Sequence, residues 1–441
     1  MIKKTILRIF VNVVVDRLIL WPFLFPIIFG MKEVQREEKH KNNGISILAL
    51  NSPRFRSDLE ILSKAGFRIY KLPYKWQTRI FYAYQDKDIN FGQTQTVHWF
   101  ENLFLDTPSN SFIYKDRVRI RKYLSCLLSA IIKRKKINCI IGAGLFYNQD
   151  FDWGAAAEMS GCPYVVFHRE NLIESKDAYL DSVKGARFLK KIGFSGTYIV
   201  FHNRKMKEIY DQYSGVLESK IFALGALRMD KFVTDAYSKK NLANNKRILL
   251  FSFPESDVIS FNYFSRDFGW YELNKDVHTS FVELAIKYPE IEFVIKHKGV
   301  NWNKTKDLLE NIGAFDLQNL KIYGNDYDAH KLIFKSDVIT GFSTTALLET
   351  GITGKPIVYP LFAEASNPKY KDFLYFKDAP KMFSIANSKE HYKELIMKKY
   401  KDKIVSETKN RYRELRFESQ VSSIKADSID KYTNLLIDIC N

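Results

Sequence analysis

The stretch of this chain that decides the fold is Asp337-Val-Ile-Thr-Gly-Phe-Ser-Thr-Thr-Ala-Leu-Leu-Glu-Thr-Gly-Ile-Thr-Gly-Lys-Pro-Ile-Val-Tyr-Pro360. Its first residues predict a short apolar strand, and a turn of small residues from Gly341 to Thr345 follows. A helix that carries Glu349 comes next, and it ends at Gly351 and Gly354 before a second apolar strand leaves. Such a unit presents hydroxyl and backbone N–H groups at the start of a helix, where a phosphate is stabilised. A purely structural βαβ unit whose helix is capped by Ser or Thr has the same pattern.

Short apolar strands alternate with helical segments on both sides of this stretch. Strands are predicted at 45–50, 67–72, 137–141, 164–167, 198–201 and 221–224, and again at 248–252, 291–296 and 320–323. Such alternation predicts parallel sheets that helices cover on both faces. Residues 74–116 interrupt the pattern, and their aromatic-rich composition predicts a long irregular connection.

The predicted fold class is therefore α/β, with two Rossmann-like domains. Residues 44–237 form the N-terminal domain and residues 248–388 the C-terminal domain, and the polar segment 238–247 links them. Residues 1–43 form a separate apolar segment, and the highly charged residues 389–441 are predicted to form C-terminal helices. A length of 441 residues fits two or three domains.

The stretch 337–360 resembles the nucleotide-sugar site of GT-B glycosyltransferases. It is most similar to the donor segment of the enzyme that makes peptidoglycan lipid II and of bacterial capsule and surface-carbohydrate transferases. The resemblance implies two Rossmann-like domains that face each other across a cleft, with the nucleotide-sugar donor bound by the second domain. It also implies that Ser343, Thr344 and Thr345 bind the donor phosphate and that Glu349 holds the ribose hydroxyls.

A second candidate donor element, Lys296-His297-Lys298, follows the predicted strand 291–296. It resembles the Lys-x-His-Pro motif of GT-B families that use CMP- or CDP-activated donors, although no proline follows His297. One imidazole and two ammonium groups at a strand end suit a phosphate leaving group, because they stabilise the charge that develops on it. We expect His297 to be catalytic and the two lysines to bind the donor, although a solvated basic loop would have the same composition. The motif favours a cytidine nucleotide slightly over uridine.

Two further residues are expected to contact the donor. The segment from Gly225 to Asp230 resembles the Gly-x-x-Arg-x-Asp stretch before the linker of several GT-B enzymes, which makes Arg228 a candidate. Ser252 ends the first strand of the second domain, and its backbone N–H could contact the phosphates. A turn shaped by Pro254 explains that loop equally well.

The acceptor side is predicted to lie in the first domain. His168-Arg169-Glu170 follows the strand 164–167, and glycosyl transfer with inversion needs a general base close to the acceptor hydroxyl. Glu170 or His168 could be that base, and Arg169 could bind an acceptor phosphate or carboxylate. Gly142 and Gly144 could let the acceptor approach the backbone, although a tight strand exit explains them too.

Composition limits the partners and the cofactors. The chain has 68 basic and 50 acidic residues and a net charge of +18, which indicates an anionic partner or a Lys-rich coding bias. The sequence contains no nucleic-acid-binding motif. The four cysteines and eight histidines form no metal-binding pattern, so the cysteines are predicted to be free thiols and neither a metal nor a cofactor is expected.

The prediction of where the protein is located in the cell rests on its N-terminal segment. Its uninterrupted apolar part, from Leu18 to Phe29, is shorter than the roughly 20 residues that a spanning helix needs. Flanking basic residues and Trp21 favour a segment that lies in an anionic membrane surface, at the cytoplasmic face of the bacterial inner membrane. A tilted membrane anchor and a helix packed on the protein itself are the alternatives.

These observations predict a membrane-associated glycosyltransferase, of the EC 2.4 class, that acts in surface polysaccharide synthesis. It would move a sugar from a nucleotide-activated donor to a lipid-linked glycan acceptor. A UDP-sugar 2-epimerase shares the fold and a similar donor segment, and a CDP-alditol phosphotransferase is a further alternative. A non-catalytic GT-B-like protein that binds glycan or an assembly partner would also fit the pattern.

Overall fold

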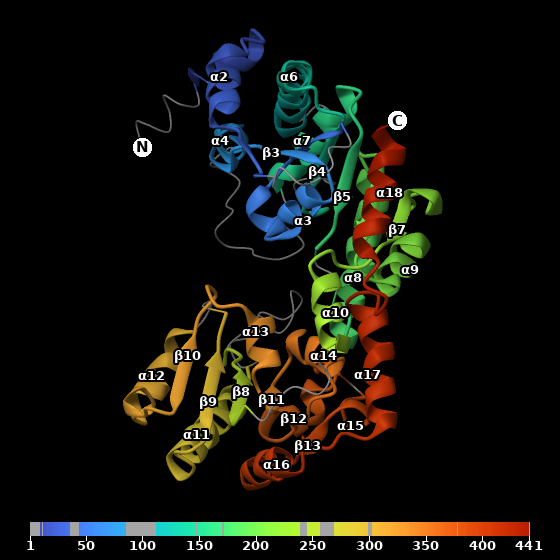
Figure 1. The fold of residues 1–441 in the computed structure, drawn as a ribbon. Helices are drawn as coiled ribbons and strands as arrows, with labels where there is room; N and C mark the ends of the chain where they lie inside the picture. The colour runs from blue at the N-terminus through green and yellow to red at the C-terminus, as the bar shows by residue number, and fades with distance from the viewer. Residues whose placement is uncertain are drawn as a thin grey trace. The chain divides into compact units, whose positions relative to one another are not determined.

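The computed structural model describes residues 9–10, 12–35, 44–84, 112–146, 148–169, 172–238, 245–255, 269–298, 302–376 and 378–440. The chain divides into two compact units, each built around one sheet (Figure 1). The first unit comprises residues 1–171, 183–230 and 427–441, and the second comprises residues 172–182 and 231–426.

The sheet of the first unit has seven strands in the order β1-β3-β2-β4-β5-β6-β7. They are β1 (Lys32–Glu33), β2 (Ser46–Ala49), β3 (Arg68–Lys71), β4 (Cys139–Gly142), β5 (Tyr164–Phe167), β6 (Tyr198–Phe201) and β7 (Ile221–Ala223). All neighbours pair in parallel except β1, which runs antiparallel to β3. Strands β2, β4 and β5 are buried along their whole length, which explains why they read as continuous apolar runs rather than as alternating ones.

Helices surround this sheet. They are α2 (Trp21–Gly30), α3 (Asp58–Lys64), α4 (Tyr74–Tyr84), α6 (Phe112–Lys135), α7 (Asn148–Met159), α9 (Arg204–Tyr213) and α18 (Ser428–Cys440). The C-terminal helix α18 belongs to this unit because Tyr432 and Leu436 are fully buried in the core that contains Phe167 and Ile141. That packing joins the end of the chain to its N-terminal sheet.

The sheet of the second unit has six strands in the order β10-β9-β8-β11-β12-β13. They are β8 (Arg247–Phe251), β9 (Glu292–Lys296), β10 (Leu320–Tyr323), β11 (Val338–Gly341), β12 (Ile357–Pro360) and β13 (Ser384–Ala386). Every pair is parallel. The first strand, β8, lies between β9 and β11, so the order of strands reverses direction there.

The helices of the second unit include α11 (Tyr271–Lys287), α12 (Asn303–Asn311), α13 (Ala329–Phe334), α14 (Ala346–Gly351), α15 (Ala379–Met382), α16 (Lys389–Asp402) and α17 (Glu407–Gln420). Two helices are shared by the units. Helix α8 (Lys176–Ile192) begins in the second unit and continues into the first, and α10 (Met229–Ser238) begins in the first and continues into the second.

The structure places several boundaries differently from the sequence pattern. The division between the units falls at Asp230, within α10, rather than at the polar segment 238–247. Within the range 74–116, for which an irregular connection was predicted, residues 74–84 form α4 and α6 begins at Phe112. The prediction was wrong for these residues because it rested on composition rather than on the spacing of their apolar side chains.

The N-terminal segment is helical and packs on the first unit by one side. Phe23 and Ile27 of α2 are buried, and the Phe23 ring lies edge-on to Trp76 at 6.0 Å and to Tyr123 at 6.2 Å between ring centroids. The segment also exposes large apolar side chains, at Ile9, Phe10, Val13, Leu18, Trp21, Phe25 and Phe29. Across the described parts of the chain, no helix combines the length and apolarity that crossing a bilayer requires.

Candidate functional site

The predicted donor elements of the second unit lie at the carboxyl edge of its sheet, on the loops after β8, β9 and β11. Right-handed crossovers send the chain after β8 to one face of the sheet and the chain after β11 to the other. The two loops therefore diverge where the strand order reverses, and ligands of open α/β sheets bind at such a point. The loop after β8 begins at Ser252, the loop after β11 contains Ser343, and the loop after the neighbouring β9 begins at His297.

The loop after β9 gathers the predicted basic residues at this edge. Lys296 is buried, its Nζ donates to the carbonyl oxygen of His297 at 3.0 Å, and burial lowers its pKa. The His297 ring stacks on Trp302, with ring centroids 4.0 Å apart and planes 7° apart. Burial, followed by the charge of Lys296, lowers the pKa of His297, so the imidazole is neutral at pH 7. Lys298 is exposed. The element thus combines one held imidazole with one buried and one solvated ammonium group.

The loop after β11 carries the predicted phosphate-binding hydroxyls. Ser343 adopts a left-handed backbone conformation, with φ of +47°, which is uncommon outside glycine, asparagine and aspartate. Its Oγ is buried and makes no hydrogen bond of standard geometry to the described part of the chain. Thr344 is buried and its hydroxyl accepts from the backbone N–H of Ala346 at 3.4 Å, while Thr345 immediately precedes α14. Because α14 is only six residues long, the local N–H groups of this turn matter more than any helix dipole.

Glu349, the predicted ribose ligand, lies in the first turn of α14 and is buried. Its Oε2 lies 3.2 Å from Nε2 of His330 on α13, and the His330 ring in turn packs on Phe232 at 4.2 Å between centroids. The sequence did not indicate His330 as a partner. A ribose that bonded to Glu349 would meet a carboxylate already oriented by this imidazole.

Ser252 makes a contact that sequence reasoning missed. Its Oγ lies 2.9 Å from Nε2 of His278, whose Nδ1 lies 2.7 Å from the carbonyl oxygen of Asn274. Burial lowers the pKa of His278 to about 4, so the ring is neutral, Nδ1 donates to the carbonyl and Nε2 accepts from the serine. The Ser252 backbone N–H donates to the backbone carbonyl oxygen of Lys296 at 2.9 Å. Both Ser252 donors are thus taken within the protein, and a ligand would meet this residue as an acceptor.

The start of α11, which follows the loop after β8, is occupied by a carboxylate. Glu364 accepts from the backbone N–H of Glu272 at 2.8 Å through Oε1 and from that of Leu273 at 2.9 Å through Oε2. A helix N-terminus is a ready anion site. In this unit a side chain of the protein fills it, so the phosphate-binding groups that remain are those after β9 and β11.

In the first unit, the structure brings together residues that the sequence places far apart. Arg56 and Asp58 follow β2, Arg169 follows β5, and Arg228 follows β7. We call these three arginines around Asp58 the arginine cluster. Arg169 donates through Nη1 to Asp58 and, at 2.9 Å, to the carbonyl oxygen of Phe55. Burial raises the pKa of Asp58, whereas the charges of Arg169, Arg228 and Arg56 oppose that shift.

Two histidines lie beside the arginine cluster. His168 is buried, and its Nδ1 accepts from the backbone N–H of Leu145 at 3.4 Å. Burial, followed by the charges of Arg228 and Arg169, lowers the pKa of His202 well below its ordinary value. Arg228, predicted as a donor contact, therefore belongs to this environment in the first unit. Glu170, the other predicted base, lies outside the described residues.

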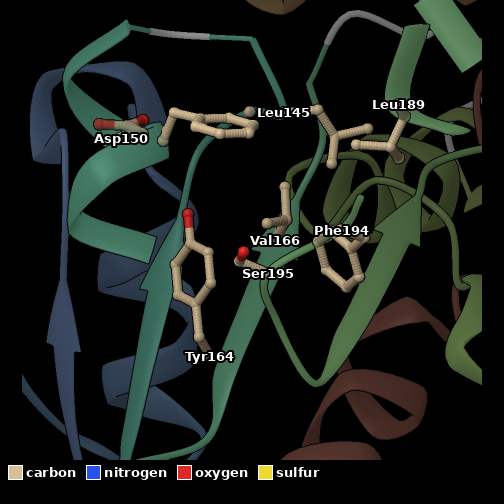
Figure 2. A pocket seen from close by; sticks show the side chains of 9 residues that line it. Leu145, Asp150, Tyr164, Val166, Leu189, Phe194 and Ser195 are labelled. Carbon is tan, nitrogen blue, oxygen red and sulfur yellow. The ribbon is translucent and has the colours of Figure 1, made fainter. Parts of the chain in front are cut away.

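A small cavity next to β4 and β5 contains a second polar group that sequence reasoning missed, Asp150. Its Oδ1 accepts from Gln77 at 2.8 Å and its Oδ2 from Asn51 at 3.3 Å, and all three side chains are buried. Burial raises the pKa of Asp150 to about 7. The cavity, of about 20 Å³, also borders Gly144, Tyr164 and Ser195, and Figure 2 shows the Tyr164 hydroxyl pointing to the end where Asp150 lies. That volume holds about one water molecule.

Gly142, a predicted acceptor contact, has a packing role in the structure. A Cβ atom at this position would lie 2.2 Å from the hydroxyl oxygen of Tyr164, and one at Gly154 would lie 2.5 Å from the same ring. The two glycines therefore leave the space that the buried Tyr164 ring fills. Gly144, by contrast, borders the cavity.

Replacing Gly142 with alanine is expected to destabilise the first unit by about 1–3 kcal/mol, because the Tyr164 ring is buried and cannot move aside. Urea unfolding of the wild-type and variant proteins measures this change. The Gly142→Ala/Tyr164→Phe double variant removes the nearest oxygen and should recover part of the loss. Additive losses in the two single variants and the double variant would contradict a direct clash.

The sequence contains a signal that could have indicated Asp150, but none that could have indicated its partners. Asp150 stands in the first turn of a helix that follows a strand, which is a position where a carboxylate is expected to cap. Its partner Asn51 lies on the loop after β2 and its partner Gln77 lies in α4, and only the folded unit joins them. No group of three or more His, Cys, Asp or Glu side chains placed to hold a metal ion occurs within the described ranges.

Comparison with known proteins gives matches at the level of structure. No family model matches the sequence, and the search of curated proteins found no match. A putative UDP-N-acetylglucosamine 2-epimerase from Listeria monocytogenes superposes with a TM-score of 0.50 at 12% identity, over 89% of this chain and 96% of that one. A UDP-GlcNAc 2-epimerase from Neisseria meningitidis gives 0.49 at 14% identity, over 89% and 99%. A glycosyltransferase from Rickettsia africae gives 0.45 at 13% identity, over 90% and 99%.

The likeness to the Listeria structure shows the fold of this chain. It has two parallel-sheet α/β domains of the GT-B type, as the sequence predicted.

Proposed function

We propose that the protein is a nucleotide-sugar-dependent glycosyltransferase of bacterial surface-polysaccharide synthesis, and that the second unit binds the donor. The observation that carries the proposal is the meeting of two predicted elements at one edge of a sheet. The basic element 296–298 follows β9, and the small-residue turn 342–345 follows β11 beside the point where the strand order reverses. Cations and hydroxyl groups at such an edge suit a phosphate-linked nucleotide.

The chemistry follows from the charges of this site. As the glycosidic bond to the phosphate breaks, negative charge grows on the leaving phosphate oxygens. Lys296 and Lys298 stabilise that charge, and the neutral His297 ring, held by Trp302, donates a hydrogen bond without needing to be protonated. These groups supply the positive charge that a metal ion supplies elsewhere, so nucleotide binding should survive a chelator.

The acceptor hydroxyl needs a base, and we propose Glu170 ahead of His168 for this role. The Nδ1 atom of His168 accepts the backbone N–H of Leu145 at 3.4 Å, so this nitrogen is already used within the protein. Glu170 is therefore the better proposal for the base.

The experiment that tests the donor site is a thermal-shift screen of the full chain against CMP, CDP, UDP and GDP. A ligand that binds the folded state raises the melting temperature by mass action. One of these nucleotides should do so, and Lys298→Gln should reduce the shift. Lys287→Gln, at an exposed position at the end of α11, is the matched control. If no nucleotide shifts the melting temperature, the donor site is refuted.

Turnover assays on the same protein distinguish the alternative functions once the nucleotide that it binds is known. A UDP-sugar 2-epimerase, which is the name given to the Listeria protein of similar fold, would convert the UDP-sugar without any acceptor. A CDP-alditol phosphotransferase would release CMP rather than CDP. A non-catalytic glycan-binding or assembly protein would bind without turnover.

The exposed side of the N-terminal segment supports a place at the cytoplasmic face of the inner membrane, near a lipid-linked acceptor. Trp21 is 63% exposed and Phe29 is 81% exposed, while Phe23 between them holds the segment to the first unit. An apolar side next to basic residues suits the surface of an anionic bilayer.

The triple variant Trp21→Ser/Phe25→Ser/Phe29→Ser is expected to lose binding to vesicles that contain anionic lipid, since these side chains supply the apolar contact. Sedimentation with vesicles measures it. The control changes three apolar residues that are exposed elsewhere, Leu217→Ser/Ile404→Ser/Leu415→Ser, and should bind as the wild type does. Equal binding by both variants would rule out a membrane role for the segment.

A further inference from the structure

The arginine cluster of the first unit has more positive charge than its own fold requires. Arg56, Arg169 and Arg228 act on a single carboxylate, that of Asp58, and the neighbouring His202 is neutral at pH 7 because burial and the two arginines lower its pKa. Among the described residues whose charges act on the cluster, the excess is therefore about two positive charges by formal charges of ordinary side chains.

One arginine of the cluster is held firmly and another is not. Arg169 donates to Asp58 and to the Phe55 carbonyl oxygen, so its guanidinium is oriented by two acceptors. The Nη1 atom of Arg228 is buried and makes no hydrogen bond within the described part of the chain. Leaving a charged donor buried without an acceptor is costly, so natural proteins rarely keep one without a role.

The position of the cluster suits a ligand. Its members stand on the loops after β2, β5 and β7 and beside the loop after β6, all at the carboxyl edge of the parallel sheet. Binding groups in open α/β sheets gather at this edge. Guanidinium groups match phosphate oxygens in pairs of parallel hydrogen bonds, and an excess of two charges matches a diphosphate.

We propose that the arginine cluster is an oxyanion site of the first unit, which binds a phosphate or diphosphate group through Arg228 and Arg169. Asp58 positions Arg169 and limits the charge of the empty site. The site stands on the geometry of the first unit alone. Its assignment to the phosphate groups of a lipid-linked acceptor rests on the proposed function, because the donor-binding residues lie in the second unit.

Calorimetric titration of the full chain with inorganic pyrophosphate tests the site. Arg228→Gln is expected to weaken binding by about 10–100-fold, which is what hydrogen bonds between charged groups contribute. Its melting temperature should stay unchanged or rise, because a repulsive charge is removed. Arg134→Gln changes the same charge at an exposed position of α6, and Lys298→Gln changes the donor element of the second unit. Arg134→Gln should bind pyrophosphate as the wild type does, and Lys298→Gln should weaken only the binding at the donor element.

Asp58→Asn is expected to change the affinity for pyrophosphate in the opposite direction to Arg228→Gln. It removes the one carboxylate of the cluster, so pyrophosphate should bind several-fold more tightly while the melting temperature falls. A residue with only a structural role would not show tighter binding. The proposal is overturned if Arg228→Gln binds as Arg134→Gln does, or if binding is lost in Lys298→Gln and kept in Arg228→Gln.

A second titration identifies the source of the phosphate. If the site takes the acceptor, Arg228→Gln weakens binding of farnesyl diphosphate, a short isoprenyl diphosphate, and leaves binding of CDP and UDP unchanged. The reverse pattern would overturn the acceptor assignment. If no nucleotide binds the protein while Arg228→Gln still abolishes pyrophosphate binding, the proposed function fails and the oxyanion site remains.

Discussion

Replacing His297 with alanine is expected to lower turnover of the nucleotide-sugar donor by about 10²–10³-fold, the loss that follows removal of one preorganised donor to a developing charge. His297 is held against Trp302 with the two rings 7° from parallel, and its pKa is lowered, so it is a fixed neutral donor at pH 7. Because the leaving phosphate gains charge only as the bond breaks, kcat should fall far more than KM rises.

The measurement is the release of nucleotide from the donor that the binding screen identifies. His391→Ala is the control, because His391 lies on α16, where its Nδ1 accepts the backbone N–H of Asn387 at 3.4 Å. Because the pKa of His297 is lowered, protonation of this ring should not reduce the wild-type rate at neutral or higher pH. Unchanged turnover in His297→Ala would remove this residue from the mechanism.

Replacing Asp150 with asparagine is expected to give the second large effect, which is on the free energy of unfolding and its dependence on pH. Burial raises the pKa of Asp150 to about 7 from an ordinary value of 3.8, so between these values the folded state holds a proton that the unfolded state releases. Below pH 3.8 both states are protonated and the carboxyl group costs nothing. As the pH rises, stability falls by about 1.4 kcal/mol per pH unit until the folded group also ionises, which limits the loss to about 4 kcal/mol.

The amide of the variant does not titrate, so the wild type should lose stability relative to Asp150→Asn between about pH 4 and pH 7. Above pH 7 the difference should level off. Urea unfolding at a series of pH values measures this difference, and Glu158→Gln on the exposed side of the same helix is the matched control. A difference that does not vary with pH would show that the folded protein holds Asp150 in its ordinary ionisation state.

The parallel fold could be predicted because each of its elements is local. The strands at 164–167 and 198–201 read as apolar runs since helices cover both faces of the sheet. The turn at 341–345 and the helix that carries Glu349 follow from small residues and glycines close by in the sequence. The helix α4 was missed because its aromatic-rich residues were interpreted as part of a long irregular connection.

The candidate sites could be predicted only in part. The elements 296–298 and 342–345 were expected at strand ends, and they lie there. Arg228 was expected beside the donor, whereas the folded first unit places its charge next to Asp58 and Arg169. Gly142 was expected at the acceptor, whereas the buried Tyr164 ring accounts for its missing side chain.

The sequence by itself determined the α/β class, the two series of strands and the basic and small-residue loops that follow them. Only the tertiary structure decided which of those loops meet. Asp58 and Arg169 are 111 residues apart, and Asn51 and Asp150 are 99 apart, yet each pair is joined by a hydrogen bond. Periodicity and capping report a residue's near neighbours along the chain. The pairing order of parallel strands decides which distant loops share an edge, and no short stretch of sequence encodes that order.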